Sequence, residues 1–133
     1  MRDEGDGAWE LLAQNSVLGS LTSAQKTQLQ TYLVPCNAAD NEVLWRVGDI
    51  PKRAYLVADA TVMLRCPEGE LKPFTSGAFV GEVDALRLAA PSPSSARVTE
   101  TGGLFAIEQP DLVRFFEDNP GVYLSFLGTR FVE

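Results

Sequence analysis

The sequence predicts a mainly β domain with flanking helices, built around an antiparallel β-roll or jelly roll of about eight short strands. Helical patterns occur only near the two ends of the chain. Short apolar segments fill the middle, and turn-forming residues separate them. With 133 residues the chain can bury a core of its own, because a chain of this size buries roughly two-thirds of the surface that its unfolded form exposes.

Two helices are predicted before the first strand. The first begins near Ala8, where apolar residues gather on one side of the segment. The second begins at a capping box, in which Thr22 is the N-cap and Gln25 follows three residues later. Apolar residues at helical spacing then predict a short amphipathic helix over residues 23–33, which Pro35 ends.

The middle of the chain has the pattern of strands. In NEVLWRV, the residues Val43, Trp45 and Val47 alternate with the others, as in a strand with one buried face. The intervening segments GDIPK and PEGE are predicted turns, and SGAFVGE is a predicted loop. The remaining strands are predicted at AYLV, TVMLRC, LKPF, ARVTE and LFAI.

Helical patterns return near the C-terminus. Pro110 suits the first turn of a helix, and the carboxylate of Asp111 favours the positive end of the helix dipole. The segment EDNP ends that helix, and Pro120 begins another whose apolar residues continue to Phe131.

Composition and charge exclude several classes of function. Eleven basic residues against eighteen acidic ones give a net charge of −7, which argues against nucleic acid as a partner. The chain contains no histidine, so a histidine-ligated metal centre and a histidine-based triad are excluded. A metal-dependent oxygenase of the jelly-roll type would lack its usual metal ligands, and we expect no enzyme. No apolar run is long enough for membrane insertion, and we expect a cytoplasmic protein.

The two cysteines, Cys36 and Cys66, have two interpretations. We expect two free thiols in a reducing compartment, and a disulfide between them is the alternative. Two cysteines alone make a poor zinc site.

In their order and spacing, these segments resemble the cyclic nucleotide-binding domain family over residues 18–127. The resemblance rests on LTSAQKTQLQTYL, NEVLWRVGDI, AYLVADATVML, SGAFVGEVDAL, PSSARV and LFAIEQPDLVRFFEDNP. It implies that residues 1–17 are a lead-in with a short helix, and that residues 128–133 begin a further, truncated C-terminal helix. It also implies cAMP or cGMP as a possible ligand and no cofactor.

The resemblance places a phosphate-binding cassette between SGAFVGE and PSSARV. A short helix beginning at Gly81-Glu82 would direct backbone N–H groups at the cyclic phosphate. Gly81 would allow close approach of the backbone, and Glu82 would accept a hydrogen bond from the ribose 2′-hydroxyl. The candidate ligand-binding residues are Val80, Gly81, Glu82, Val83, Ser94, Ser95, Ala96 and Arg97, together with Arg87.

The cassette departs from the family pattern in three ways, which makes it a degenerate cassette. Ser94 stands where the family has an arginine, the segment between Gly81 and Pro93 is longer by about three residues, and Asp84 adds a second carboxylate. Losing the arginine would cost on the order of 2–4 kcal/mol of binding free energy. Arg87 or Arg97 could act as a substitute phosphate ligand.

We therefore expect a non-catalytic regulatory domain, part of a larger protein, that binds cAMP or cGMP weakly or not at all. The implied partner is an attached or associated effector: a kinase, channel, transporter or exchange factor. Two alternatives stay open. One is a functional cyclic nucleotide sensor. The other is a structural docking module that uses apolar residues near its end: Phe126, Leu127, Phe131 and Val132.

Overall fold

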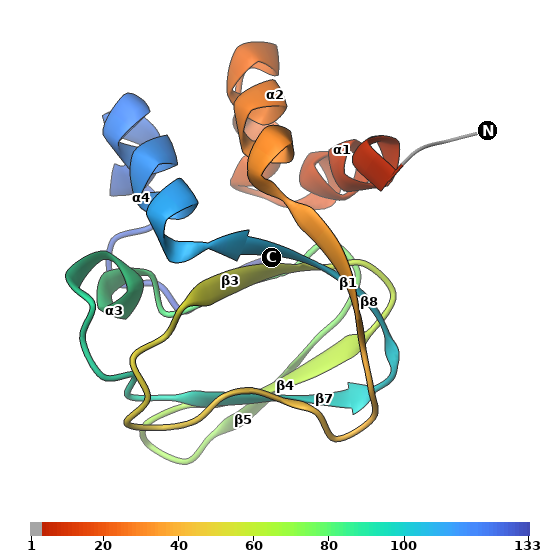
Figure 1. Cartoon of the computed structure of the whole chain (residues 1–133), viewed down its shortest axis with the longest axis vertical. Coiled ribbons are helices and arrows are strands. Elements are labelled where there is room, and N and C mark those ends of the chain that lie inside the picture. Colours follow the sequence, from red (N-terminus) through yellow and green to blue (C-terminus); the bar gives the residue numbers. More distant parts are fainter. Residues whose placement is uncertain (1–3) are drawn as a thin grey trace.

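The computed structural model describes the backbone of residues 4–133 and the side chains of residues 7–133. Helices lie at both ends of this part of the chain, and a further one interrupts the strands (Figure 1). They are α1 (Glu4–Gln14), the 3-10 turn η1 (Leu18–Ser20), α2 (Ser23–Tyr32), α3 (Val83–Leu88), α4 (Gln109–Asp118) and α5 (Pro120–Leu124).

Within residues 4–133, nine strands form two antiparallel sheets. Sheet A has the strand order β1-β8-β3-β6-β9, and sheet B has the order β2-β7-β4-β5. The predicted class, antiparallel strands with helices at both ends, is confirmed. The strands are β1 (Val34–Ala38), β2 (Val43–Trp45), β3 (Arg53–Val57), β4 (Thr61–Arg65), β5 (Leu71–Phe74), β6 (Phe79–Val80), β7 (Ser95–Glu100), β8 (Gly102–Glu108) and β9 (Phe131–Val132).

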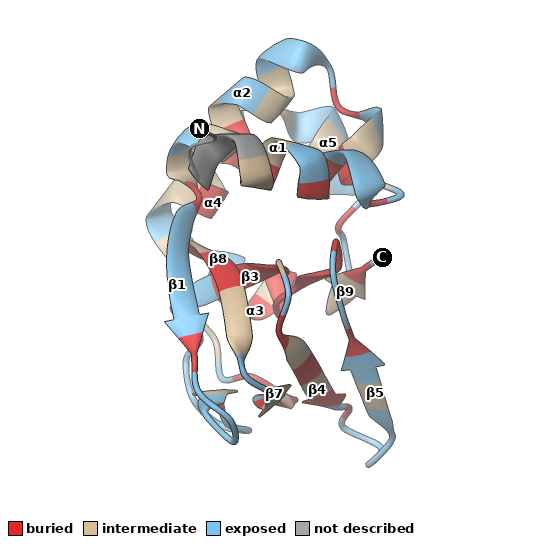
Figure 2. Ribbon diagram, turned by 90° about the vertical axis from the view of Figure 1, so that its right-hand side faces the viewer, coloured by how far each residue is buried: buried red, intermediate tan, exposed pale blue. Residues whose placement is uncertain are grey.

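The central strands of sheet A, β3 and β6, are buried on both faces, whereas its edge strand β1 is mostly exposed. The outer face of sheet A lies under α1, α2 and α4, and Leu56 of β3 packs there in one cluster with Leu12 of α1 and Phe115 of α4 (Figures 1 and 2). On the inner face, Val57 and Leu104 pack in a second cluster with residues of sheet B. Because apolar side chains leave water on both faces, sheet A is the centre of the fold.

Sheet B is buried on one face only. Val62, Leu64 and Val98 point into the cluster between the sheets and are fully buried. None of the helices in residues 4–133 covers the opposite face, which we call the outer face of sheet B (Figures 1 and 2). The molecule therefore has three layers: helices, sheet A and sheet B.

The local signals at the N-terminal side predict the structure well. The capping box is confirmed: the Thr22 hydroxyl accepts a hydrogen bond from the Gln25 amide at 3.1 Å, and the Thr22 amide donates to the Gln25 side chain at 2.9 Å. Helix α1 begins at Glu4, earlier than the predicted start near Ala8. Residues 1–3 of the predicted lead-in lie outside the described residues.

Other local predictions are wrong. The strand β1 follows α2 directly, although Pro35 was predicted only to end a helix; Pro35 is tolerated because β1 is an edge strand. The predicted loop SGAFVGE contains β6, and Val47 is exposed beyond the end of β2. The helix predicted to continue to Phe131 ends with α5, and residues 128–133 form a turn and β9 instead of the start of a helix.

A buried side chain joins the two ends of the described chain. The Asn15 amide nitrogen donates to the carbonyls of Gly77 at 3.0 Å and Val132 at 2.8 Å, while its oxygen accepts from the amides of Val17 and Leu18, each at 3.0 Å. All the hydrogen-bonding groups of this side chain are thus used. The corner after α1 is fastened to β9 and to the loop before β6.

Two further expectations concern the membrane and the cysteines. Within residues 4–133, every helix is too short or too polar to cross a bilayer. Cys36 on β1 is exposed, Cys66 beyond β4 is buried, and both are free thiols.

Candidate functional site

The candidate site begins where β6 leads into α3. A Cβ atom on Gly81 would lie 2.7 Å from the Cβ of Ala54 on the neighbouring strand β3, so only glycine fits at this close approach. The Gly81 amide donates to the Arg130 carbonyl at 2.8 Å. The glycine is therefore explained by packing inside sheet A, and its amide is already in use.

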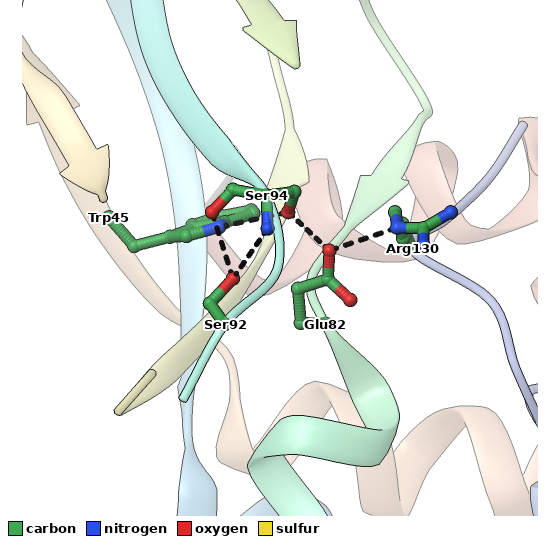
Figure 3. A network of polar contacts seen from close by, with 5 residues as sticks. All are labelled: Trp45, Glu82, Ser92, Ser94 and Arg130. Carbon is green, nitrogen blue, oxygen red and sulfur yellow. Dashed lines mark hydrogen bonds and ion pairs between the residues drawn. The ribbon is translucent and has the colours of Figure 1, made fainter. Parts of the chain in front are cut away.

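Glu82 is the buried acid at the centre of this region. It occupies the N-cap position of α3, but its side chain caps no helix amide. Its carboxylate instead accepts a hydrogen bond from the Ser94 hydroxyl, and Arg130 Nε lies 3.2 Å from the same oxygen (Figure 3). Since Glu82 is only 5% exposed, both partners serve to compensate a carboxylate removed from water.

Ser94 is fully buried and is bonded on several sides. Besides donating to Glu82, its hydroxyl lies 3.3 Å from Trp45 Nε1, which donates to it. Its amide donates to the Ser92 hydroxyl at 3.2 Å, and that hydroxyl donates to the Ser94 carbonyl at 2.9 Å (Figure 3). Ser94 is thus the centre of a buried polar network at the edge of the core.

The lengthened part of the cassette is folded against a neighbouring turn. Ala89 ends α3 in the left-handed conformation, with φ 53°. The Ser92 amide donates to the Asp49 carbonyl at 2.7 Å, and the Gly48 amide donates to the Ser92 carbonyl at 2.8 Å. These bonds fix the path of the segment that leads to Ser94.

Three charged residues of the cassette point elsewhere. The Asp84 carboxylate faces the Gly128 amide, at 3.4 Å. The Arg87 guanidinium lies over the ring of Tyr123, 5.6 Å from its centroid. Arg97 is exposed between the buried Ala96 and Val98 and belongs to the outer face of sheet B. Neither arginine lies at the Glu82–Ser94 pair.

The other candidate residues line the cassette as part of the core. Val80 and Ala96 belong to the cluster between the sheets, and Val83 belongs to the cluster under the helices. Ser95, at the start of β7, is half-buried. These four residues frame the polar network and add no charge to it.

Arg130 is a residue of the candidate site that no sequence pattern identified. It enters the site from the turn before β9, and its Nε atom is buried without a well-aligned hydrogen bond, so its attraction to Glu82 is that of an ion pair. A small cavity of about 260 Å³ between α3, the lengthened segment and this turn is lined by Glu82, Asp84 and Arg130. No local motif marks Arg130, because only the pairing of β9 with β6 brings it to the cassette.

The apolar residues expected to form a docking surface near the end of the chain are mostly internal. Phe126 is 2% exposed and packs edge-on against Phe79, with 5.6 Å between ring centroids. Phe131 packs on Phe74 at 4.6 Å, and Val132 is buried in sheet A. Only Leu127 of the four is exposed, so this part of the docking prediction is wrong.

The chemistry available in this region is polar recognition. Among the described residues, no group of three or more cysteine, aspartate or glutamate side chains is close enough to hold a metal ion. The network offers one carboxylate, two serine hydroxyls and one guanidinium.

Comparison with known proteins agrees with the predicted family. The model of the cyclic nucleotide-binding domain matches residues 35–119. The cGMP-dependent 3′,5′-cGMP phosphodiesterase A of Dictyostelium discoideum is 33% identical over 135 residues, a match that covers 100% of this chain and 15% of that protein. The chain thus spans less than a sixth of that relative.

Solved structures share the fold. A putative cyclic nucleotide-binding protein from Ruegeria pomeroyi superimposes with a TM-score of 0.73 at 21% identity, over 94% of this chain and 57% of that one. The regulatory domain of Toxoplasma gondii PKA, crystallised with cAMP, gives a TM-score of 0.72 at 20% identity, over 96% of this chain and 52% of that one.

Proposed function

The chain belongs to the cyclic nucleotide-binding domain family, a non-catalytic type of domain, and on that premise we propose that it is a regulatory module that binds cAMP or cGMP weakly or not at all. One observation carries the proposal: the carboxylate of Glu82 is already held by the chain's own Ser94 and Arg130. The cassette is degenerate in this sense. We further propose that the module is part of a larger protein and acts on an attached or associated effector.

A nucleotide would have to break this network before it could use Glu82. Its 2′-hydroxyl would replace the Ser94 hydroxyl, and the loss of that donor would leave Ser94 and the Trp45 N–H to find other partners in a buried place. A buried polar group without a partner costs about 1–3 kcal/mol. This penalty weakens binding in addition to the loss of the cassette arginine.

The cyclic phosphate would meet few positive charges. Arg87 and Arg97, the possible substitutes, lie over Tyr123 and on the outer face of sheet B. Arg130 is the cation at the cassette, but it is engaged with Glu82 and lines the same cavity as the carboxylate-bearing Asp84. Without a bidentate arginine, affinity falls by roughly 30- to 1000-fold, since each tenfold corresponds to about 1.4 kcal/mol.

The sensor alternative has one observation in its favour, and it concerns Arg130. If Glu82 turned to a ribose hydroxyl, the guanidinium of Arg130 would be released within the same small cavity and could meet the phosphate. A functional sensor would therefore depend on Arg130, more than on Arg87 or Arg97.

The test is a backbone amide NMR titration with cAMP and cGMP to millimolar concentration. We expect the amides of Gly81, Glu82, Val83 and residues 95–97 to shift only at millimolar ligand or not at all. Saturable shifts of these amides at micromolar ligand would overturn the proposal. Repeating the titration with Arg130→Ala then decides whether that binding uses Arg130.

A gain-of-function variant sharpens the test. Ser94→Arg restores the family's residue, and its matched control, Ser95→Arg, adds the same charge one residue away. We expect nucleotide affinity to increase by at least tenfold in the first variant and to stay unchanged in the second. Amide spectra without ligand check that each variant is folded, and equal affinities in both folded variants would contradict the role assigned to position 94.

A further inference from the structure

Three arginines of this acidic protein lie together on the outer face of sheet B. Arg65 of β4, Arg97 of β7 and Arg46 just beyond β2 line a shallow groove of about 240 Å³. The groove also contains apolar side chains, namely Val43, Met63 and Leu71. Three of the eleven basic residues of the chain thus share one surface, although the net charge is −7.

The register of sheet B explains how these side chains meet. Arg97 pairs with Val43 on one side and with Met63 on the other, while Arg65 pairs with Ser95 and Leu71. Arg65 and Arg97 are therefore diagonal neighbours on adjacent strands, a relation that brings long side chains within reach of one another. Like charges in such positions repel, so this arrangement does not stabilise the fold.

The carboxylates near the groove are engaged with other groups. Glu100 accepts a hydrogen bond from the Thr61 hydroxyl at 3.3 Å, and Glu70 pairs with Lys72 at 3.8 Å. No acidic residue lines the groove. Within the described part of the chain, Arg46, Arg65 and Arg97 make no ion pair.

We propose that the outer face of sheet B docks an acidic, extended segment of a partner protein. Carboxylates of that segment pair with the guanidinium groups of Arg65 and Arg97, which can each bind a carboxylate through two hydrogen bonds. An apolar side chain of the segment lies between them on Met63. The local positive charge and the apolar lining of the groove favour such a peptide over nucleic acid, whose binding needs a more extended basic surface than three arginines. This docking surface is separate from the cassette and goes beyond the proposed function.

The proposal is tested by amide NMR titration of the whole chain with a synthetic peptide, acetyl-Glu-Asp-Leu-Glu-Asp-amide. Its control replaces every acidic residue by the corresponding amide. We expect the acidic peptide to shift Val43, Met63, Ser95, Arg97 and Thr99 in the millimolar range, and we expect high salt to reduce the effect, because exposed charges are screened. The amide control should leave these signals in place.

A pair of charge-removing variants locates the contact. In Arg65→Gln/Arg97→Gln, affinity for the acidic peptide should fall roughly three- to tenfold, as expected for the loss of exposed ion pairs. The matched control is Arg87→Gln/Arg114→Gln, which removes the same charge from helices α3 and α4 and should leave affinity unchanged. All four arginines are exposed, so both double variants should fold. Amide spectra without peptide check that they do.

Five results would overturn the proposal. These are equal shifts with the uncharged peptide, shifts centred away from sheet B, and equal losses of affinity in both double variants. The fourth is concentration-dependent shifts of the same amides without any peptide, which would assign the surface to a second copy of the chain. A single-stranded DNA oligomer that shifts these amides as strongly as the peptide would likewise contradict recognition of an acidic segment.

Discussion

Sheets A and B differ in what covers them, and the difference explains their sequences. Strand β3 of sheet A is buried at every position from Ala54 to Val57, because helices cover one face and sheet B the other. Strands β4 and β7 of sheet B alternate buried and exposed residues, because one face meets solvent. Unlike β3, the strands β4 and β7 can therefore carry charged side chains without desolvating them. The following predictions test this contrast, from the largest effect to the smallest.

The largest effect is expected under the helices. Leu56→Ala should lower the free energy of unfolding by about 2–5 kcal/mol, since a fully buried leucine leaves a cavity when it is truncated. Leu71→Ala on the outer face of sheet B, where the side chain is 51% exposed, should change it by less than about 0.5 kcal/mol. Urea unfolding followed by circular dichroism measures both. Equal losses would mean that the two faces are equally covered.

The next effect concerns the close approach of β6 and β3. Gly81→Ala should destabilise by about 1–3 kcal/mol, because the new methyl group would lie 2.7 Å from Ala54 Cβ. Gly121→Ala is its control, since a Cβ at that position of α5 meets no atom within 4 Å. Thermal unfolding of the two variants distinguishes them. A Gly81→Ala protein as stable as its control would remove the packing explanation of this glycine.

A similar or smaller loss is expected at the edge of the inner core. Ser94→Ala removes the donor to Glu82 and the acceptor for Trp45, at a cost of about 1–3 kcal/mol. Ser95→Ala, one residue further along the chain, should change stability by less than about 0.5 kcal/mol. If both variants unfold at the same urea concentration, the network contributes nothing to stability.

The smallest expected effect concerns the chemical reactivity of the two cysteine thiols. Partial burial and the nearby Glu42 carboxylate raise the pKa of the Cys36 thiol, and burial raises that of Cys66, so at neutral pH each has less of the reactive thiolate than an ordinary cysteine. In the native protein Cys36 should be alkylated slowly, faster as pH rises toward its raised pKa, and Cys66 should react only after unfolding. Mass spectrometry after timed iodoacetamide treatment follows both. Native Cys36 that reacts faster than the same thiol in urea would contradict the direction of the shift.

The helices and strands that depend on local sequence patterns were predicted correctly. The capping box at Thr22 and most strands of sheet B appear as expected, because neighbouring residues alone set their period or cap. β1, β6 and β9 were missed, since two of these strands have only two residues and all three exist through pairing with distant segments. The two-residue strands β6 and β9 are too short to show alternation, and in β1 the proline Pro35 indicated only the end of a helix.

The candidate site was predicted only in part, because some of its residues are neighbours in the chain and others meet only through the fold. Gly81 and Glu82 are adjacent in the chain, and the resemblance to the family pointed to them together with Ser94. The hydrogen bond between Glu82 and Ser94 depends on how the lengthened segment folds against Gly48 and Asp49, which sequence spacing does not encode. Arg130 depends on the course of the chain after α5, where a continuing helix had been predicted.

The side chain of Asn15 has a consequence for cooperativity. Because its amide group bonds Val132, Gly77 and the start of η1 together, none of these segments can open without breaking bonds of the others. Segments linked in this way exchange their amide protons as one unit. We therefore expect the segment after α1, β9 and the loop before β6 to open as a single unit, and Arg130, the residue before β9, connects this unit to Glu82.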